Sequence, residues 1–381
     1  MKKFNFSKAE KIVIKLGSSL VTKDREGLDE KCLSNLIKQI AILNSQQKKV
    51  VLVSSGAIAA GLKKLGVKKR PKVLSELQSA AAVGQMDLVR VYEELFTENE
   101  LISAQILLTH NDLSDRKRYL NARSTIFNLM KSDVIPVINE NDTVASEEIR
   151  FGDNDSLAAM VANLIEADLL VLLTDQDGLF SSDPREDSNA KLIHHGYVDD
   201  KNLDAIASGT KSKIGTGGMA TKILAARRAA LSGAHTIIAS GEKKNVLVDL
   251  SYDQDIGTFL QSREVKLIAR KKWLADNLKS NGKIYVDHGA EIALINDGKS
   301  LLAAGITKVS GTFDRGDVIQ CLNESRQEIV RGLVNYNSEE VKKIIGVSSD
   351  KIESILGYVN ESSLIHRNNM IIIKTVRKEN D

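Results

Sequence analysis

The sequence predicts an α/β protein: a three-layer αβα sandwich with a mainly parallel sheet, followed by a small, mostly β domain. Apolar runs of strand length alternate with longer helical patterns from residue 12 to residue 260, which is typical of βαβ units. These runs lack polar alternation, as expected for parallel strands buried on both faces. After residue 280 the pattern changes to short strand-like runs separated by turns, which predicts the second domain.

The predicted strands of the large domain are residues 12–16, 50–54, 102–108, 134–138, 169–174 and 235–239. Helical periodicity lies between them. One face of the first helix carries Leu33, Leu36, Ile37, Ile40 and Leu43. A further helix starts near Asp112 and carries Leu120, Ile126, Phe127 and Met130, and an alanine-rich helix extends from about residue 219 to residue 232.

Length and composition favour an enzyme of two domains in a reducing compartment. The chain has 381 residues, too many for one ordinary domain. Its net charge of +3 is too slight to imply nucleic acid or membrane by itself. Two cysteines, Cys32 and Cys321, are too few for a disulfide framework, and we find no export signal or membrane span, so we expect a cytoplasmic protein.

Polar loops follow the predicted strands at the edge where ligands bind in such sheets. They are residues 17–19 (GSS), 54–57 (SSGA), 139–142 (NEND) and 174–178 (TDQDG), together with 151–156 (FGDNDS) just before a helix. Each loop alone can be explained by turn and helix-cap chemistry, and Asp153, Asn154 or Asp155 can simply cap the following helix. Five such loops on one edge favour a binding site.

Two glycine turns, each with a lysine, predict a polyphosphate site. Residues 215–222 (GTGGMATK) end a polar loop and open the alanine-rich helix, so backbone N–H groups, the helix N-terminus and Lys222 can all face an anion. Lys15 lies in the first strand, just before Gly17. A flexible loop before a helix is the alternative for the glycine pair. Neither stretch is a P-loop or a dinucleotide fingerprint.

The polar segment 181–213 contains Asp183, Pro184 and Arg185 and precedes the glycine turn. Its length predicts a mobile surface excursion or lid that could cover a nucleotide or phosphate.

Several motifs together resemble the amino acid kinase family. They are KLGSS at 15–19, SSGA at 54–57, GDND at 152–155, LLTD at 172–175 and GGMATK at 217–222, and their order and spacing match over residues 10–262. Residues 53–61, 81–85, 119–123 and 136–142 are similar to the members of that family that use ATP to phosphorylate the γ-carboxylate of L-glutamate, the first step of proline biosynthesis.

The resemblance implies a role for each motif residue. Lys15 and Lys222 would supply positive charge to the transferred phosphoryl group, and Asp155 would hold the two ammonium groups in place. The ATP-binding residues would be Lys15, Gly17, Thr174, Asp175, Thr216, Gly217, Gly218, Met219, Ala220, Thr221 and Lys222. The substrate-binding residues would be Ser55, Gly56, Ala57, Asn139, Asp142 and Asn154.

The same resemblance implies cofactors and partners. Mg²⁺ would be held largely by the ATP phosphates and water, with no metal-ligating side chain assigned. Asp142 is the natural partner for the substrate ammonium group. The family further suggests proline as an inhibitor, a homo-oligomer, and a glutamate 5-phosphate reductase that receives the product.

The C-terminal part is expected to form its own domain. The predicted division is a kinase domain at 1–262, a linker or short helix at 263–280, a small β barrel at 281–360 and a tail at 361–381. The expected strands are residues 283–286, 293–295, 307–309, 318–321 and 329–333, with residues 370–373 as a possible last strand. Residues 298–306 and 311–318 resemble the PUA domain found in RNA-modifying enzymes.

Two function classes therefore compete: a metabolic kinase with an accessory domain, and an RNA-binding protein whose large domain is a scaffold or sensor. Aromatic residues make up only 4% of the chain, and the PUA-like part lacks a dense basic stripe interleaved with aromatic rings. The composition thus favours the kinase and leaves RNA binding by the PUA-like part open.

Overall fold

The computed structural model describes residues 6–23, 27–145, 154–209, 218–263 and 282–373. The chain divides into two compact units, one formed by Met1–Ser114 with Ala122–Ala269 and the other by Asp115–Asn121 with Arg270–Asp381. Within the described ranges, none of the helices has the length and apolar character needed to span a membrane.

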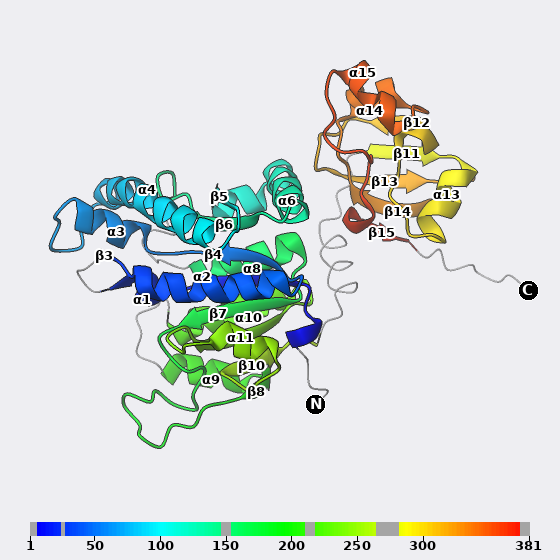
Figure 1. Ribbon diagram of the computed structural model, residues 1–381. Coiled ribbons are helices and arrows are strands. Elements are labelled where there is room, and N and C mark those ends of the chain that lie inside the picture. The colour runs from blue at the N-terminus through cyan, green and yellow to red at the C-terminus, as the bar shows by residue number, and fades with distance from the viewer. Residues whose placement is uncertain (1–5, 24–26, 146–153, 210–217, 264–281, 374–381) are drawn as a thin grey trace, which may run out of the picture. The chain divides into compact units, whose positions relative to one another are not determined.

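The large unit is built on an eight-stranded sheet with strand order β5-β6-β4-β1-β7-β9-β10-β8 (Figure 1). The strands are β1 (Lys11–Leu16), β4 (Lys49–Val53), β5 (Ser103–Leu108), β6 (Ile135–Glu140), β7 (Leu169–Thr174), β8 (His195–Tyr197), β9 (His235–Ser240) and β10 (Thr258–Gln261). β10 is antiparallel to β9, and the other pairs are parallel. All six predicted strands are confirmed; β8, β10 and the short ribbon of β2 (Thr22–Lys23) and β3 (Gly27–Leu28) were not predicted.

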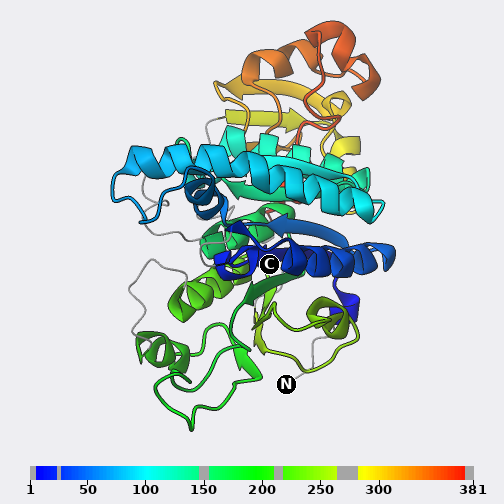
Figure 2. The same ribbon diagram turned by 60° about the vertical axis from the view of Figure 1, so that its left-hand side comes forward.

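Helices cover both faces of this sheet, which confirms the three-layer prediction. One face packs against α2 (Glu30–Ser45), α4 (Leu74–Glu98) and α11 (Val246–Ser251), and α2 and α4 lie side by side in both views (Figures 1 and 2). The other face packs against α8 (Asn154–Ile165) and α10 (Met219–Ala230). The first helix buries the apolar face expected for it, Leu33, Leu36, Ile37, Ile40 and Leu43.

Three predictions for the large unit need correction. The single helix expected from Asp112 is two, α5 (His110–Ser114) and α6 (Arg116–Lys131), because the Asp115 carboxylate accepts the Arg118 N–H at 2.9 Å and caps a new helix. β5 is only partly buried because it lies at the sheet edge. Asn139 and Glu140, expected in a loop, are the last residues of β6.

The segment expected to be a mobile lid contains short paired elements where the structure describes it. A bridge joins Phe180 to Leu192, β8 pairs with β10, and α9 (Asn202–Gly209) follows. The backbone hydrogen bonds from Ser181 N to Lys191 O and from Ile193 N to Leu179 O extend the bridge. The part of the prediction beyond residue 209, up to 213, lies outside the described residues.

The C-terminal unit is mostly β, as predicted. Its sheet has the order β12-β11-β13-β14-β15, formed by β11 (Gly282–Val286), β12 (Ile306–Gly311), β13 (Val318–Leu322), β14 (Glu328–Leu333) and β15 (Met370–Ile372). Residues 293–295 are not a strand but the end of α13 (His288–Ile295), which Asp287 caps by accepting the Ala290 N–H at 2.7 Å. The helices α14 (Ser338–Ile344) and α15 (Ile352–Leu356) were not predicted.

The remaining short elements are α1 (Ser18–Val21), α3 (Ala57–Lys64) and the 3₁₀ turns at Phe6–Lys8, Ala303–Gly305, Ser349–Lys351 and Arg367–Asn369. Cys32 and Cys321 are both free thiols, in line with the expected lack of a disulfide framework.

Two glycines let the backbones of α3 and α4 come into direct contact. A Cβ added to Gly61 of α3 would lie 1.7 Å from the carbonyl oxygen of Ala80, and one added to Gly84 of α4 would lie 1.9 Å from the carbonyl oxygen of Ala57. Neither neighbour is a flexible side-chain end, so the backbones themselves would have to move apart. The glycines therefore fix the place where α3 begins.

We predict that Gly84→Ala destabilises the protein although alanine is the better helix former. The forced separation of the two helices should lower the free energy of unfolding by about 1–3 kcal/mol, measured by urea denaturation. Gly289→Ala is the matched control, because its Cβ would meet only the Asp287 carboxylate, at 3.4 Å. Equal stability of the two variants would contradict the packing role of Gly84.

Candidate active site

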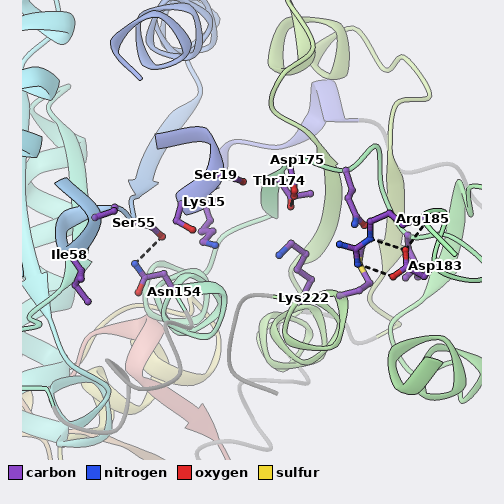
Figure 3. Close-up of a pocket in the computed structure, with 18 of the residues that line it drawn as sticks. Lys15, Ser19, Ser55, Ile58, Asn154, Thr174, Asp175, Asp183, Arg185 and Lys222 are labelled. Atoms are coloured by element: carbon purple, nitrogen blue, oxygen red, sulfur yellow. Dashed lines mark hydrogen bonds and ion pairs between the residues drawn. The ribbon is translucent and has the colours of Figure 1, made fainter. Parts of the chain in front are cut away.

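A cavity of about 420 Å³ lies at the carboxyl edge of the sheet, where the loops after β1, β4, β6 and β7 converge. Figure 3 shows its residues as sticks: Ser55 and Ile58 lie at one end, Asp183 and Arg185 at the other, and Lys15 and Lys222 between them. We call these the α3 end and the Arg185 end of the cavity. The edge predicted from the polar loops is thus the edge where the cavity forms.

Lys15 enters the cavity from the end of the central strand. In β1 the residues Ile12, Ile14 and Leu16 belong to the core under α2, so strand alternation directs Lys15 to the opposite face, where α8 packs. Lys15 is only 5% exposed, and its Nζ lies 2.6 Å from Oδ1 of Asp155.

Asp155 is the fully buried carboxylate to which both lysines bind. It is the second residue of α8, where a negative charge is favoured by the helix dipole. Lys222, in the first turn of α10, places Nζ 3.2 Å from Oδ2, and the Thr221 hydroxyl donates to the same oxygen at 2.9 Å. The packing of α10 against α8 therefore brings two positive charges to one negative charge.

The electrostatics of this triad, Lys15, Asp155 and Lys222, keep the carboxylate ionised. Burial raises the pKa of Asp155, but the positive charges of the two lysines and the hydrogen bonds together lower it further, from 3.8 to about 2. Because the folded-state pKa is depressed, the stabilisation from this carboxylate is present above pH 3.8 and is lost as the pH falls toward 2.

The turn after β1 closes the cavity beside Lys15. The N–H of Gly17 donates to the carbonyl oxygen of Leu173 at 3.0 Å, so this glycine joins β1 to β7 rather than offering its own donor to a ligand. The first N–H groups of α1, those of Ser18 and Ser19, have no intrahelical acceptor, and both residues line the cavity.

At the α3 end, Asn154 connects three segments. Its side-chain amide donates toward the carbonyl oxygen of Ser54 at 2.7 Å and Oδ1 of Asn139 at 3.1 Å. It also donates toward the hydroxyl of Ser55 at 3.1 Å (Figure 3). Gly56, with φ of 100°, begins α3 without a side-chain cap. The predicted substrate residues Ser55, Gly56, Ala57, Asn139, Asp142 and Asn154 therefore all line one cavity.

Further side chains contact the residues that form the α3 end of the cavity. Asn139 donates its amide to Oε1 of Gln85 at 2.8 Å, and the hydroxyl groups of Ser54 and Tyr92 lie 2.7 Å apart. Glu140 is 4% exposed and lines the cavity, with its Oε2 at 3.6 Å from Nδ1 of His110. Gln85 lies within residues 81–85, but sequence reasoning assigned no role to it.

At the Arg185 end, two side chains are locked together. Arg185 donates from Nε and Nη2 to the two carboxylate oxygens of Asp183, at 3.0 and 2.8 Å. The Thr174 hydroxyl donates to the Asp175 carboxylate at 2.9 Å, and both residues line the cavity as predicted. Arg185 and Arg70, which also lines the cavity, were not assigned to the site, because a single exposed arginine in a loop carries no motif signal.

The glycine turn is described only in part. Gly218 and Met219 line the cavity, Ala220 lies in the first turn of α10, and Thr221 acts on the cavity through Asp155. Thr216 and Gly217 lie outside the described residues, as do Gly152 and Asp153 of the fourth motif. Among described residues, no group of three or more His, Cys, Asp or Glu side chains could hold a metal ion.

Comparison with known proteins matches both units. Residues 10–240 match the amino acid kinase family model, and residues 282–356 match the PUA domain model. Glutamate 5-kinases of Nitrosomonas eutropha and Nitrosospira multiformis are 55% and 56% identical over 365 residues, covering 96% of this chain and 98% of each relative. The UMP kinase structure from Bacillus anthracis aligns with 13% identity and a TM-score of 0.46, covering 67% of this chain and 97% of that one.

We predict that Lys15→Ala and Lys222→Ala each lower the turnover number of the enzyme by roughly 10²–10³, as expected for loss of one preorganised positive charge. The comparison variant is Lys23→Ala, because Lys23 is half exposed and lies outside the cavity. Circular dichroism of each variant separates lost charge from lost folding. Near-normal turnover in both folded lysine variants would contradict the role of the triad.

Proposed function

This chain belongs to the amino acid kinase family, and from that premise we propose that it is a glutamate 5-kinase. It transfers the γ-phosphoryl group of ATP to the γ-carboxylate of L-glutamate, forming L-glutamate 5-phosphate in the first step of proline biosynthesis. The observation that carries this conclusion is similarity to glutamate 5-kinases at more than half identity along almost the whole chain.

The triad supports a role in phosphoryl transfer. This reaction needs little covalent help from the protein; it needs an in-line acceptor and positive charge on the phosphate oxygens. Lys15 and Lys222 supply that charge, and Asp155 keeps the two ammonium groups from separating despite their repulsion. Lysine requires such an orienting partner because it is a point charge on a flexible chain.

Recognition of the acceptor is assigned to the α3 end of the cavity. Asp142 pairs with the α-ammonium group, while Ser55, Asn139 and Asn154, with the Gly56–Ala57 turn, donate to carboxylates. The hydrogen bonds that Asn154 donates to the Ser55 hydroxyl and to Oδ1 of Asn139 support this assignment because they hold that hydroxyl and the Asn139 amide in place before substrate arrives.

ATP is assigned to the middle and the Arg185 end. Gly17, Thr174, Asp175 and the described part of the 216–222 stretch lie there, around the two lysines. Mg²⁺ would be held mainly by the ATP phosphates and water, which suits a site without a dedicated cluster of carboxylates among the described residues. When bound, the ion neutralises charge on the phosphate oxygens.

We propose further properties of this enzyme, its inhibitor, assembly, location and partner, from its resemblance to the family. Proline would inhibit the enzyme by competing with glutamate, the enzyme would act as a homo-oligomer in the cytoplasm, and a glutamate 5-phosphate reductase would receive the product. We also propose that the kinase domain ends near residue 262, where the last strand of its sheet, β10, has just ended at Gln261.

We predict that incubation with ATP, Mg²⁺, L-glutamate and hydroxylamine yields γ-glutamyl hydroxamate. Hydroxylamine traps acyl phosphates, so the assay reports the product of carboxylate phosphorylation directly. Aspartate, N-acetylglutamate and UMP form the comparison panel because related kinases use other acceptors. Phosphorylation of one of these without any of glutamate would refute the proposed acceptor while leaving the family intact.

We predict that Asp142→Ala raises the KM for glutamate far more than the KM for ATP, because an unpaired ammonium group in a binding pocket costs on the order of 2–5 kcal/mol. The same variant should bind proline less tightly if the inhibitor overlaps the ammonium site. Initial rates across glutamate and proline concentrations test both points. Inhibition independent of glutamate would argue against competition, and an unchanged KM for glutamate would dismiss the ammonium role.

A further inference from the structure

Arg70 is an exposed positive side chain that lines the cavity and to which the proposed function assigns no role. It lies in the basic loop between α3 and α4, residues 65–73, and lines the same cavity as Ser55, Ala57 and Asn154. Lys68, Lys69 and Lys72 of this loop are exposed and do not line the cavity. One of four neighbouring cations is therefore directed to the site.

Arg70 differs from the other cations that line the cavity in having no carboxylate partner among the described residues. The described lining residues include four cations, Lys15, Arg70, Arg185 and Lys222. The two lysines bind Asp155, and Arg185 is held in a two-point contact by Asp183. Arg70 alone among these four forms no ion pair with any carboxylate in the described part of the chain.

The acceptor itself needs a cation at this place. Glutamate carries a carboxylate at each end, and the γ-carboxylate must face Lys15 and Lys222 for transfer. The α-carboxylate then points to the opposite end of the molecule, toward the α3 end, where the charged lining residues other than Arg70 are Glu140 and Asp142. Both of these carry carboxyl groups, which offer no electrostatic attraction to a further carboxylate, so a positive group is needed there.

The neighbouring helices and Pro71 restrict the backbone from which the Arg70 side chain extends. The glycine contacts between α3 and α4 fix the helices that carry the loop, and Pro71 restricts the backbone of the residue before it to extended conformations. The uncapped N-terminus of α3 at Ala57 and Ile58 lines the cavity as well and adds partial positive charge. A guanidinium group beside it matches the two oxygens of a carboxylate.

From these observations we infer that Arg70 binds the α-carboxylate of the acceptor and thereby selects a free α-amino acid. The inference rests on the proposed glutamate kinase activity. Together with Asp142 for the ammonium group and the two lysines for the γ-carboxylate, Arg70 gives each of the three charged groups of glutamate a partner of opposite charge, so neither a simple amine nor an α-amide would satisfy the site.

The test compares Arg70→Ala, Arg70→Lys and the matched Lys69→Ala, with L-glutamate and its α-amide, L-isoglutamine, as acceptors in the hydroxamate assay. Arg70→Ala should raise the KM for glutamate about tenfold, with Arg70→Lys in between, while the KM for ATP stays within about twofold. Lys69→Ala should match the wild type. If isoglutamine is not phosphorylated, its inhibition constant against glutamate serves instead.

The decisive comparison is between the two acceptors. Because isoglutamine has no α-carboxylate charge, Arg70→Ala should leave its KM or inhibition constant unchanged. An equal loss with both compounds, or a KM for glutamate equal to that of Lys69→Ala, would overturn the role of Arg70. Failure of the wild type to form any hydroxamate from glutamate would instead overturn the proposed function on which the inference rests.

Discussion

The candidate active site depends on a buried carboxylate placed between two buried ammonium groups. Burying such charges is costly, and the arrangement is stable only because Asp155 contacts Lys15 at 2.6 Å and Lys222 at 3.2 Å, while Thr221 donates to it as well. Three separate elements, β1, α8 and α10, must hold their relative positions for this geometry to persist. The αβα sandwich supplies that rigidity, since both helices pack on one face of the central strands.

A second constraint, independent of charge, shapes the α3 end of the cavity. The backbones of α3 and α4 touch at Gly61 and Gly84, so the turn at Ser55–Ala57 cannot shift without separating two helices. Asn154 of α8 then donates both to this turn, at Ser55, and to Asn139 of β6. The residues proposed to recognise the acceptor are thus anchored to the same helix, α8, that carries Asp155.

Much of this could be predicted from the sequence because the relevant signals are local. Buried parallel strands are continuous apolar runs, and all six such runs are strands. The short strands β8 and β10 were missed because His195–Tyr197 and Thr258–Gln261 lack that apolar continuity. The prediction of a strand at residues 293–295 is wrong because their short apolar run is equally compatible with the end of a helix. The signal for that helix is its cap, Asp287, which lies several residues before the run.

The same distinction, between features with and without a local sequence signal, applies to the residues of the site. Lys15, Asp155 and Lys222 stand in motifs with distinctive residue types, whereas Arg70 and Arg185 carry no local signal and are found only because they line the cavity. The hydrogen bond from Asn139 to Gln85 joins residues far apart in the chain, so no single stretch of the sequence predicts this contact.

The central position of β1 has a consequence for synthesis on the ribosome. β1 pairs with β4 on one edge and with β7 on the other, although β7 begins only at Leu169. The strand that carries Lys15 therefore leaves the ribosome long before its second neighbour exists, with one row of backbone groups exposed to other chains. Lys15 also has no buried counter-charge at that stage, so it remains hydrated, and this hydration opposes premature burial of the unpaired strand.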